Sequence, residues 1–216
     1  MKEHFREELE EIRNNLRREI RLKAAEFDEL VQLEFGELEN NACALIVLSV
    51  NQALGGKKSS AISLATIFQF IFMADQVHRL MKDDLDLEES KRQFPVLVGD
   101  FLYGKFFLWL CKSKMLHFLA PLAKVIKTMN QGAISRWLHR GKQLPPGERI
   151  RILEMERASL TGMAAKLGAE LAGCPEKVQN QCADLGWNLG LAWAAYQDDV
   201  EYSVVEDALK KARQSI

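Results

Sequence analysis

The spacing of apolar side chains is the feature that most constrains the fold of this chain. The first example is a stripe at three- and four-residue steps among Glu and Arg, formed by Phe5, Leu9, Ile12, Leu16 and Ile20. Such spacing is typical of an amphipathic helix with one narrow apolar face. Helical spacing recurs near residues 27–38, 41–54, 61–80, 95–111, from 121 onward, 148–172, 175–202 and 204–214. Strand-like alternation is nearly absent, so the sequence predicts an all-α protein.

Turn signals separate these helices. Gly55-Gly56 is expected to end the helix at 41–54, because glycine readily adopts the left-handed conformation that follows many helices. Residues 141–147 contain Pro145-Pro146 and predict the clearest loop. The helix at 61–80 is apolar on most faces, which predicts a place in the middle of a bundle.

Composition predicts one soluble domain, 1–216, with charged N-terminal helices at 1–40, a core at 41–202 and a tail at 203–216. The 216 residues are 48% hydrophobic and 27% charged, which suffices for one sizeable core, and the formal net charge of -1 gives no reason to expect nucleic acid. The four cysteines form no CxxC pair, which favours a cytoplasmic protein. The apolar stretches at 61–74 and 101–110 fall short of the roughly 20 residues that span a bilayer, so no transmembrane segment is predicted.

Residues 186–202, GWNLGLAWAAYQDDVEY, are an apolar run that ends in clustered carboxylates. If the helix continues to residue 202, Asp198, Asp199 and Glu201 lie on one side of it. Hard divalent cations such as Mg²⁺ prefer carboxylate oxygens, with phosphate oxygens completing the shell. Asp83-Asp84 with Asp86 and Glu88 form a second acidic group. Alternatively, both acidic clusters are solvated helix ends, because runs of charged residues usually lie at the surface.

Six motifs stand in a fixed order from about Ala42 to Tyr202. They are GGKKSSA at 55–61, HRLMKDDLD at 78–86, VLVGDFL at 96–102, LAKVIKTMNQG at 122–132, ASL at 158–160 with Gly168 and Gly173, and the acidic run at 197–201. In this order the chain resembles the trans-isoprenyl (polyprenyl) diphosphate synthases, whose GGKRxRP, first DDxxD and VLAGDYL motifs correspond to the first three. The resemblance implies an isoprenoid-synthase-like helical bundle, here lacking the usual C-terminal helices.

The resemblance also implies roles for individual residues. Asp83, Asp84, Asp198 and Glu201 would be Mg²⁺ ligands that hold an allylic diphosphate, and Lys57 would hold the diphosphate of isopentenyl diphosphate. Family members dimerise through central helices, which implies an interface at Phe101, Phe106 and Trp109.

Several family positions have changed where the chemistry needs charge. Leu87 and Gln197 replace aspartates of the two acidic motifs, and Ser60 replaces an arginine. Glu156-Arg157 stands for a lysine-threonine pair, and a carboxylate near a diphosphate adds repulsion of about 1 kcal/mol or more. By resemblance the chain is closest to the small component, component I, of heteromeric heptaprenyl and hexaprenyl diphosphate synthases.

The sequence thus predicts a non-catalytic or chain-length-determining subunit of a polyprenyl diphosphate synthase in quinone side-chain biosynthesis. Its partner would be a larger catalytic subunit or a second copy, and the complex would bind allylic and isopentenyl diphosphates. One alternative is a self-sufficient Mg²⁺-dependent prenyltransferase. Another is a helical scaffold without diphosphate binding.

Overall fold

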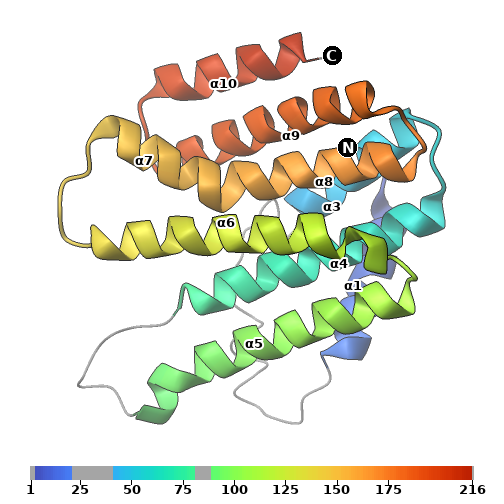
Figure 1. Ribbon diagram of the computed structural model, residues 1–216, viewed down its shortest axis with the longest axis horizontal. Helices are drawn as coiled ribbons and strands as arrows, with labels where there is room; N and C mark the ends of the chain where they lie inside the picture. The colour runs from blue at the N-terminus through green and yellow to red at the C-terminus, as the bar shows by residue number, and fades with distance from the viewer. Residues whose placement is uncertain (1–2, 21–40, 81–88, 216) are drawn as a thin grey trace. The chain divides into compact units, whose positions relative to one another are not determined.

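The structure is a computed structural model that describes residues 3–20, 41–80 and 89–215. Within those residues every regular element is helical, which confirms the predicted all-α class (Figure 1). The helices are α1 (Arg6–Glu19), α3 (Ala42–Ala53), α4 (Lys58–His78), α5 (Glu89–Lys112), α6 (Leu119–Leu138), α7 (Pro146–Leu153), α8 (Ser159–Leu171), α9 (Glu176–Gln197) and α10 (Tyr202–Gln214). A 3₁₀ turn, Leu116–Phe118, precedes α6, and a π-helical segment, Glu154–Ala158, joins α7 to α8. The helix expected at 27–38 lies outside the described residues.

Contacts divide the chain into two compact units. The first contains residues 1–45 and 62–116, and the second contains residues 46–61 and 117–216. The single domain expected from composition stays a prediction.

In the first unit, α4 supplies the core. Leu64, Phe68 and Ile71 are fully buried, which confirms the central position expected for this helix. Helix α5 packs against it through Trp109, whose indole Nε1 donates to the carbonyl of Ser63 at 3.2 Å. The apolar face of α4 and a partly buried polar contact therefore hold α5 in place.

Helix α1 is fixed to α5 by one carboxylate. Glu19 lies 2.5 Å from Lys112 Nζ and 3.5 Å from Lys105 Nζ, and its side chain is mostly buried. The hydrogen bond from Lys112 holds the pKa of Glu19 below its usual range, although burial acts in the opposite direction. We expect this stabilisation to be complete above the ordinary glutamate pKa of about 4.3, and to be lost as the pH falls through the lower folded-state pKa.

Urea unfolding at a series of acidic pH values measures that effect. Glu19→Gln should flatten the dependence of the free energy of unfolding on pH in this range, whereas Glu10→Gln, an exposed change on the same helix, should not. An unchanged pH dependence in the Glu19 variant would contradict the assigned role.

In the second unit, helices α8 and α9 approach closely because small residues face each other. A Cβ atom on Gly186 would lie 2.5 Å from the carbonyl oxygen of Thr161 and 2.7 Å from Cβ of Ala165. A Cβ on Gly190 would overlap the side chain of Thr161. The two glycines of the 186–190 run are thus explained by helix packing. Helix α10 covers another part of α9 through its buried residues Val205, Ala208 and Ala212.

Two helix boundaries differ from the prediction by more than three residues. Helix α5 begins at Glu89, not at Pro95, and contains Pro95 within it. Helix α9 ends at Gln197, not at Tyr202. The second difference changes the candidate site.

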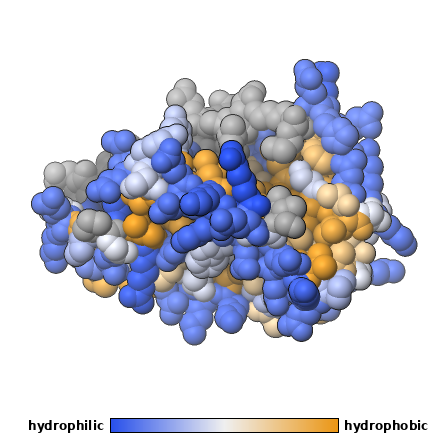
Figure 2. Space-filling view, turned by 90° about the horizontal axis from the view of Figure 1, so that it is seen from above, coloured by the Kyte–Doolittle hydropathy of each residue, from blue (hydrophilic) through white to orange (hydrophobic). Residues whose placement is uncertain are grey.

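Among the described residues, two helices are long and apolar enough to cross a membrane, namely α4 and residues 93–112 of α5, each with a mean hydropathy of 1.4. They exceed the stretches at 61–74 and 101–110 noted in the sequence because both helices continue beyond those stretches at each end. In α4, 78% of the apolar window is buried inside the protein, against 33% in α5. Burial accounts for the apolar character of α4, since core helices have the same composition. Figure 2 shows hydrophobic residues reaching the surface in patches between hydrophilic ones.

Candidate functional site

Four charged side chains of the second unit form one network around Glu156. Glu156 is 1% exposed, and Arg136 of α6 reaches both of its oxygens, with Nε 3.1 Å from each and Nη2 2.9 Å from Oε2. The Nη1 atom of Arg136 donates to Oδ1 of Asp198 at 3.4 Å. Arg149 of α7 donates from Nε to Oδ2 of Asp198 at 3.0 Å and from Nη2 to its main-chain carbonyl. Two guanidinium groups therefore neutralise two carboxylates.

Glu156 lies within the π-helical segment, from which its side chain contacts Arg136. Gly132 of α6 faces this segment so closely that a Cβ atom there would lie 2.7 Å from Cγ of Glu156. The absence of a side chain at Gly132 lets the two helices meet, and the carboxylate then extends past it to Arg136. π-Helical turns are rare and are frequent at functional sites.

The acidic run that follows α9 does not form a helical face of ligands. Asp198 is the C-cap of α9, and Asp199 has a left-handed backbone with φ of 52°. The amide of Val200 donates to the carbonyl of Ala195 at 3.0 Å, which closes the helix end as in a Schellman motif. Glu201 is the N-cap of α10. The expectation that these carboxylates share one helix face is wrong, because the helix stops before the first of them.

Among the described residues, no group of three or more His, Cys, Asp or Glu side chains could hold a metal ion. Asp198 has both carboxylate oxygens occupied by arginines, and Glu201 begins a different helix. Asp83 and Asp84 lie outside the described residues. The donor set of the second acidic run therefore does not fit Mg²⁺, which prefers carboxylates that are free to coordinate.

Lys57 lies where the sequence predicted it, in the turn that precedes α4. Gly55 has φ of 75°, and the amide of Gly56 donates to the carbonyl of Asn51 at 2.8 Å. The buried Asn51 side chain fills the space beside Gly56 and donates to the carbonyl of Gly168 at 3.2 Å. This packing leaves the Lys57 side chain exposed at the start of a helix, where a diphosphate would meet positive charge.

A second polar group lies in the first unit, where α4 ends beside α5. The His78 ring nitrogen Nε2 is 3.3 Å from the carbonyl of Val96 and 3.5 Å from Asp100. One turn back, the buried Asp75 accepts from Arg79 Nε at 2.9 Å. Burial, with Asp75 and Asp100, raises the pKa of Tyr103 well above its ordinary value. These contacts are consistent with a packed His78.

The predicted interface residues on α5 differ in exposure. Phe106 is fully buried within its own chain, and Phe101 and Trp109 are partly buried. Phe106 therefore offers no surface to a partner, because its ring fills the core. The exposed apolar side chains of α5 are instead Leu97, Phe107 and Leu108.

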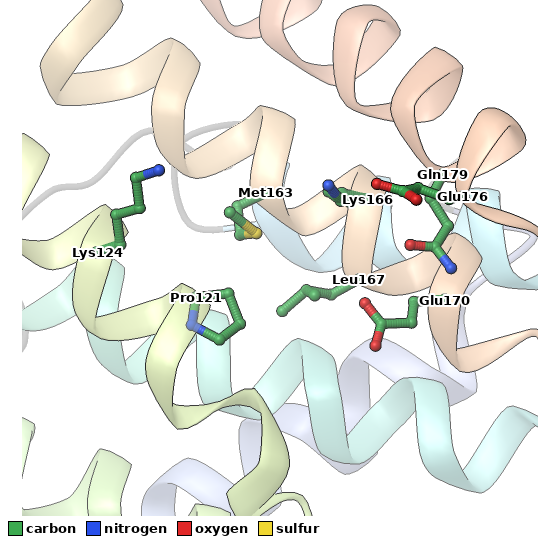
Figure 3. A pocket seen from close by; sticks show the side chains of 8 residues that line it. All are labelled: Pro121, Lys124, Met163, Lys166, Leu167, Glu170, Glu176 and Gln179. Carbon is green, nitrogen blue, oxygen red and sulfur yellow. The ribbon is translucent and has the colours of Figure 1, made fainter.

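The second unit also contains an open pocket of about 520 Å³ (Figure 3). Helices α6, α8 and α9 line it with Pro121, Lys124, Met163, Lys166, Leu167, Glu170, Glu176 and Gln179. Its charges are of both signs, and Lys166 Nζ donates to Asn180 at 3.0 Å. None of the residues predicted to bind diphosphate or metal lines it.

Sequence reasoning missed Arg136 and Arg149, which define the network. They lie 20 and 49 positions from Glu156 and Asp198 respectively, too far apart for a motif to connect them. The one usable signal was Glu156 itself, a carboxylate at a position where the resembling family has lysine.

No family model matches the chain. It is 26% identical over 176 residues to an octaprenyl diphosphate synthase of Haemophilus influenzae, covering 77% of this chain and 54% of that protein. It is 24% identical over 212 residues to component 2 of a heptaprenyl diphosphate synthase of Geobacillus stearothermophilus, covering 86% of this chain and 64% of that one. The chain thus spans about half the length of the curated relatives it matches first. The likeness to component I stays a prediction.

Solved structures show the same fold. A polyprenyl synthase of Caulobacter crescentus, complexed with calcium and isoprenyl diphosphate, superposes with a TM-score of 0.81 at 20% identity, covering 99% of this chain and 73% of that one. The small subunit of a geranyl diphosphate synthase of Antirrhinum majus superposes with a TM-score of 0.78 at 15% identity, covering 100% and 92%. The chain therefore has the fold of these synthases and is similar in sequence to octaprenyl and heptaprenyl diphosphate synthases.

Proposed function

We propose that this chain is a subunit of a polyprenyl diphosphate synthase, that it does not itself ionise an allylic diphosphate, and that it acts with a larger catalytic subunit. The observation that carries the proposal is Asp198, the expected metal ligand, which two arginines hold.

Electrostatics explains why this arrangement opposes catalysis by the chain alone. At about 4 Å and an effective dielectric constant of about 20, two like unit charges repel by about 4 kcal/mol. A divalent cation at Asp198 would meet two guanidinium groups at close range and would have to displace them. Displacing Arg136 would also leave the buried Glu156 without its bidentate partner.

The matched proteins support an assembly of unlike subunits. One is called component 2 of a heptaprenyl diphosphate synthase, and another is called the small subunit of a geranyl diphosphate synthase. In such a complex the partner supplies the metal site, and this chain would shape the complex from across the interface.

The partner surface that we propose is the exposed side of α5. Leu97, Phe107 and Leu108 are 64%, 48% and 41% exposed, and three- and four-residue steps place Leu97, Gly104 and Leu108 on one side. Exposed apolar patches on one helix face mark interaction sites. Lys57 is proposed to contact diphosphate when the complex assembles.

A condensation assay with farnesyl diphosphate, labelled isopentenyl diphosphate and Mg²⁺ tests the proposal. We expect negligible turnover by the chain alone. A mixture of the chain with a full-length synthase of the same source should show robust turnover, and that turnover should depend on both proteins. Phe107→Ser with Leu108→Ser should weaken assembly, whereas Lys210→Gln on α10 should not. Robust turnover by the isolated chain would favour the self-sufficient enzyme.

The role of Asp198 can be tested separately. In the active mixture, Asp198→Asn should leave the rate within about twofold, well below the tenfold that 1.4 kcal/mol of lost transition-state stabilisation would cause. It should instead lower the thermal midpoint, because Arg136 and Arg149 lose a charged partner. Asp184→Asn, an exposed change on the same helix, is the control. A tenfold rate loss at an unchanged melting temperature would assign Asp198 to a working metal site.

A further inference from the structure

The charge of the chain is distributed unevenly. No Asp or Glu occurs between Asp100 and Glu148, whereas this stretch contains eight Lys or Arg residues. The formal net charge of the whole chain is only -1. Lys105 and Lys112 of this stretch lie on α5 and pair with Glu19, and Arg136 pairs with Glu156 and Asp198. The remaining positive charge is local, and it falls on helix α6 and the turns at its two ends.

The outer side of α6 combines this charge with exposed apolar side chains. Ile134, Trp137 and Leu138 are 58%, 54% and 57% exposed. Lys124 and Lys127 are exposed on the preceding turns, and steps of three and four residues place them on the same side of the helix. Arg140 and Lys142 are exposed in the turn after the helix. We call these seven residues the α6 surface.

We propose that the α6 surface docks onto an anionic lipid bilayer. Tryptophan and leucine enter the boundary between headgroups and acyl chains, while lysine and arginine keep their charges among the headgroups. Each Lys or Arg near an anionic leaflet contributes attraction that falls off within a Debye length. The basic side chains lie before and after the apolar ones, along α6 and the turn that follows it, which matches both requirements.

The composition of the surface favours a bilayer over a protein partner. Lysine is depleted in protein interfaces, whose fully buried centres exclude charge. The lysines here are spread over several turns, which suits a diffuse negative surface. The first carboxylate after the basic stretch, Glu148, accepts a hydrogen bond from Ser135 at 3.1 Å. The proposal is independent of whether the chain has catalytic activity.

Co-sedimentation of the full chain with vesicles tests it. We expect binding to equimolar phosphatidylcholine and phosphatidylglycerol, and little binding to phosphatidylcholine alone. Arg140→Gln with Lys142→Gln should weaken binding about 30-fold, from two charges at about 1 kcal/mol each. The matched control is Lys210→Gln with Lys211→Gln, two exposed basic residues of α10, which should leave binding unchanged.

Insertion is measured by quenching of tryptophan fluorescence with brominated lipid. Quenching should occur in the native chain and be lost in Trp137→Phe, although three other tryptophans remain. Equal binding to neutral and anionic vesicles, or equal losses in the α6 and α10 variants, would overturn the proposal. So would retention on immobilised polyglutamate without vesicle binding, since that pattern indicates an acidic protein partner.

Discussion

Replacing Arg136 with Met is expected to lower the free energy of unfolding by about 3 kcal/mol, because removal of one partner strands a buried charge. Glu156 is 1% exposed, and Arg136 occupies both of its oxygens. The same arginine reaches Asp198, so the end of α9 also loses a contact. Urea unfolding followed by circular dichroism measures the change.

Two further variants separate the buried charge from general packing. Arg136→Met with Glu156→Leu should recover most of the stability, since a buried ion pair can often be replaced by apolar residues at little cost. Arg149→Met should cost about 1 kcal/mol or less, because its pair with Asp198 is more exposed. A double variant as unstable as Arg136→Met alone would show that burial of Glu156 is not the cause.

Gly186→Ala is expected to cost about 3 kcal/mol, at the upper end for overpacking, because the added methyl meets backbone. Its Cβ would lie 2.5 Å from the carbonyl oxygen of Thr161, which cannot rotate away. Helices α8 and α9 would have to separate, and the contacts between them are the most extensive in the second unit. Thermal and urea unfolding should both show the loss.

Gly190→Ala and Gly104→Ala are the comparison variants for Gly186→Ala. The methyl of Gly190→Ala would overlap the Thr161 side chain, so Thr161→Ala should partly restore stability there but should not rescue Gly186→Ala. Nothing lies within 4 Å of a Cβ at Gly104, so Gly104→Ala should be neutral or stabilising by up to about 1 kcal/mol. Equal losses at Gly186 and Gly104 would mean that helix approach is not the reason.

The helices could be predicted because their signals are local. The stripe from Phe5 to Ile20 became α1, and the apolar run at 61–80 became the buried α4. The predicted start of α5 is wrong because the prediction makes Pro95 the first residue of the helix. Helix α5 begins at Glu89 and includes that proline.

The candidate site was less predictable because long-range partners decide its chemistry. The apolar spacing of α9 gives no reason to stop at Gln197, and the stop coincides with the contacts of Asp198 to arginines on two other helices. The interface role predicted for Phe106 was uncertain for a similar reason, since an apolar side chain fits a core and an interface equally well. Only packing shows that it is buried.

The π-helical segment at Glu154–Ala158 also changes how the sequence should be aligned with longer synthases. A π-turn accommodates one residue more than an α-turn, and each residue of an α-helix turns through about 100°. The three- and four-residue steps that mark one face of an α-helix therefore cannot be counted across the segment. Motif spacings that cross it do not place residues on the same face. Deleting one residue there would close the π-turn into an α-turn and keep the faces of α7 and α8, so the segment can absorb a one-residue change in chain length without redirecting either helix.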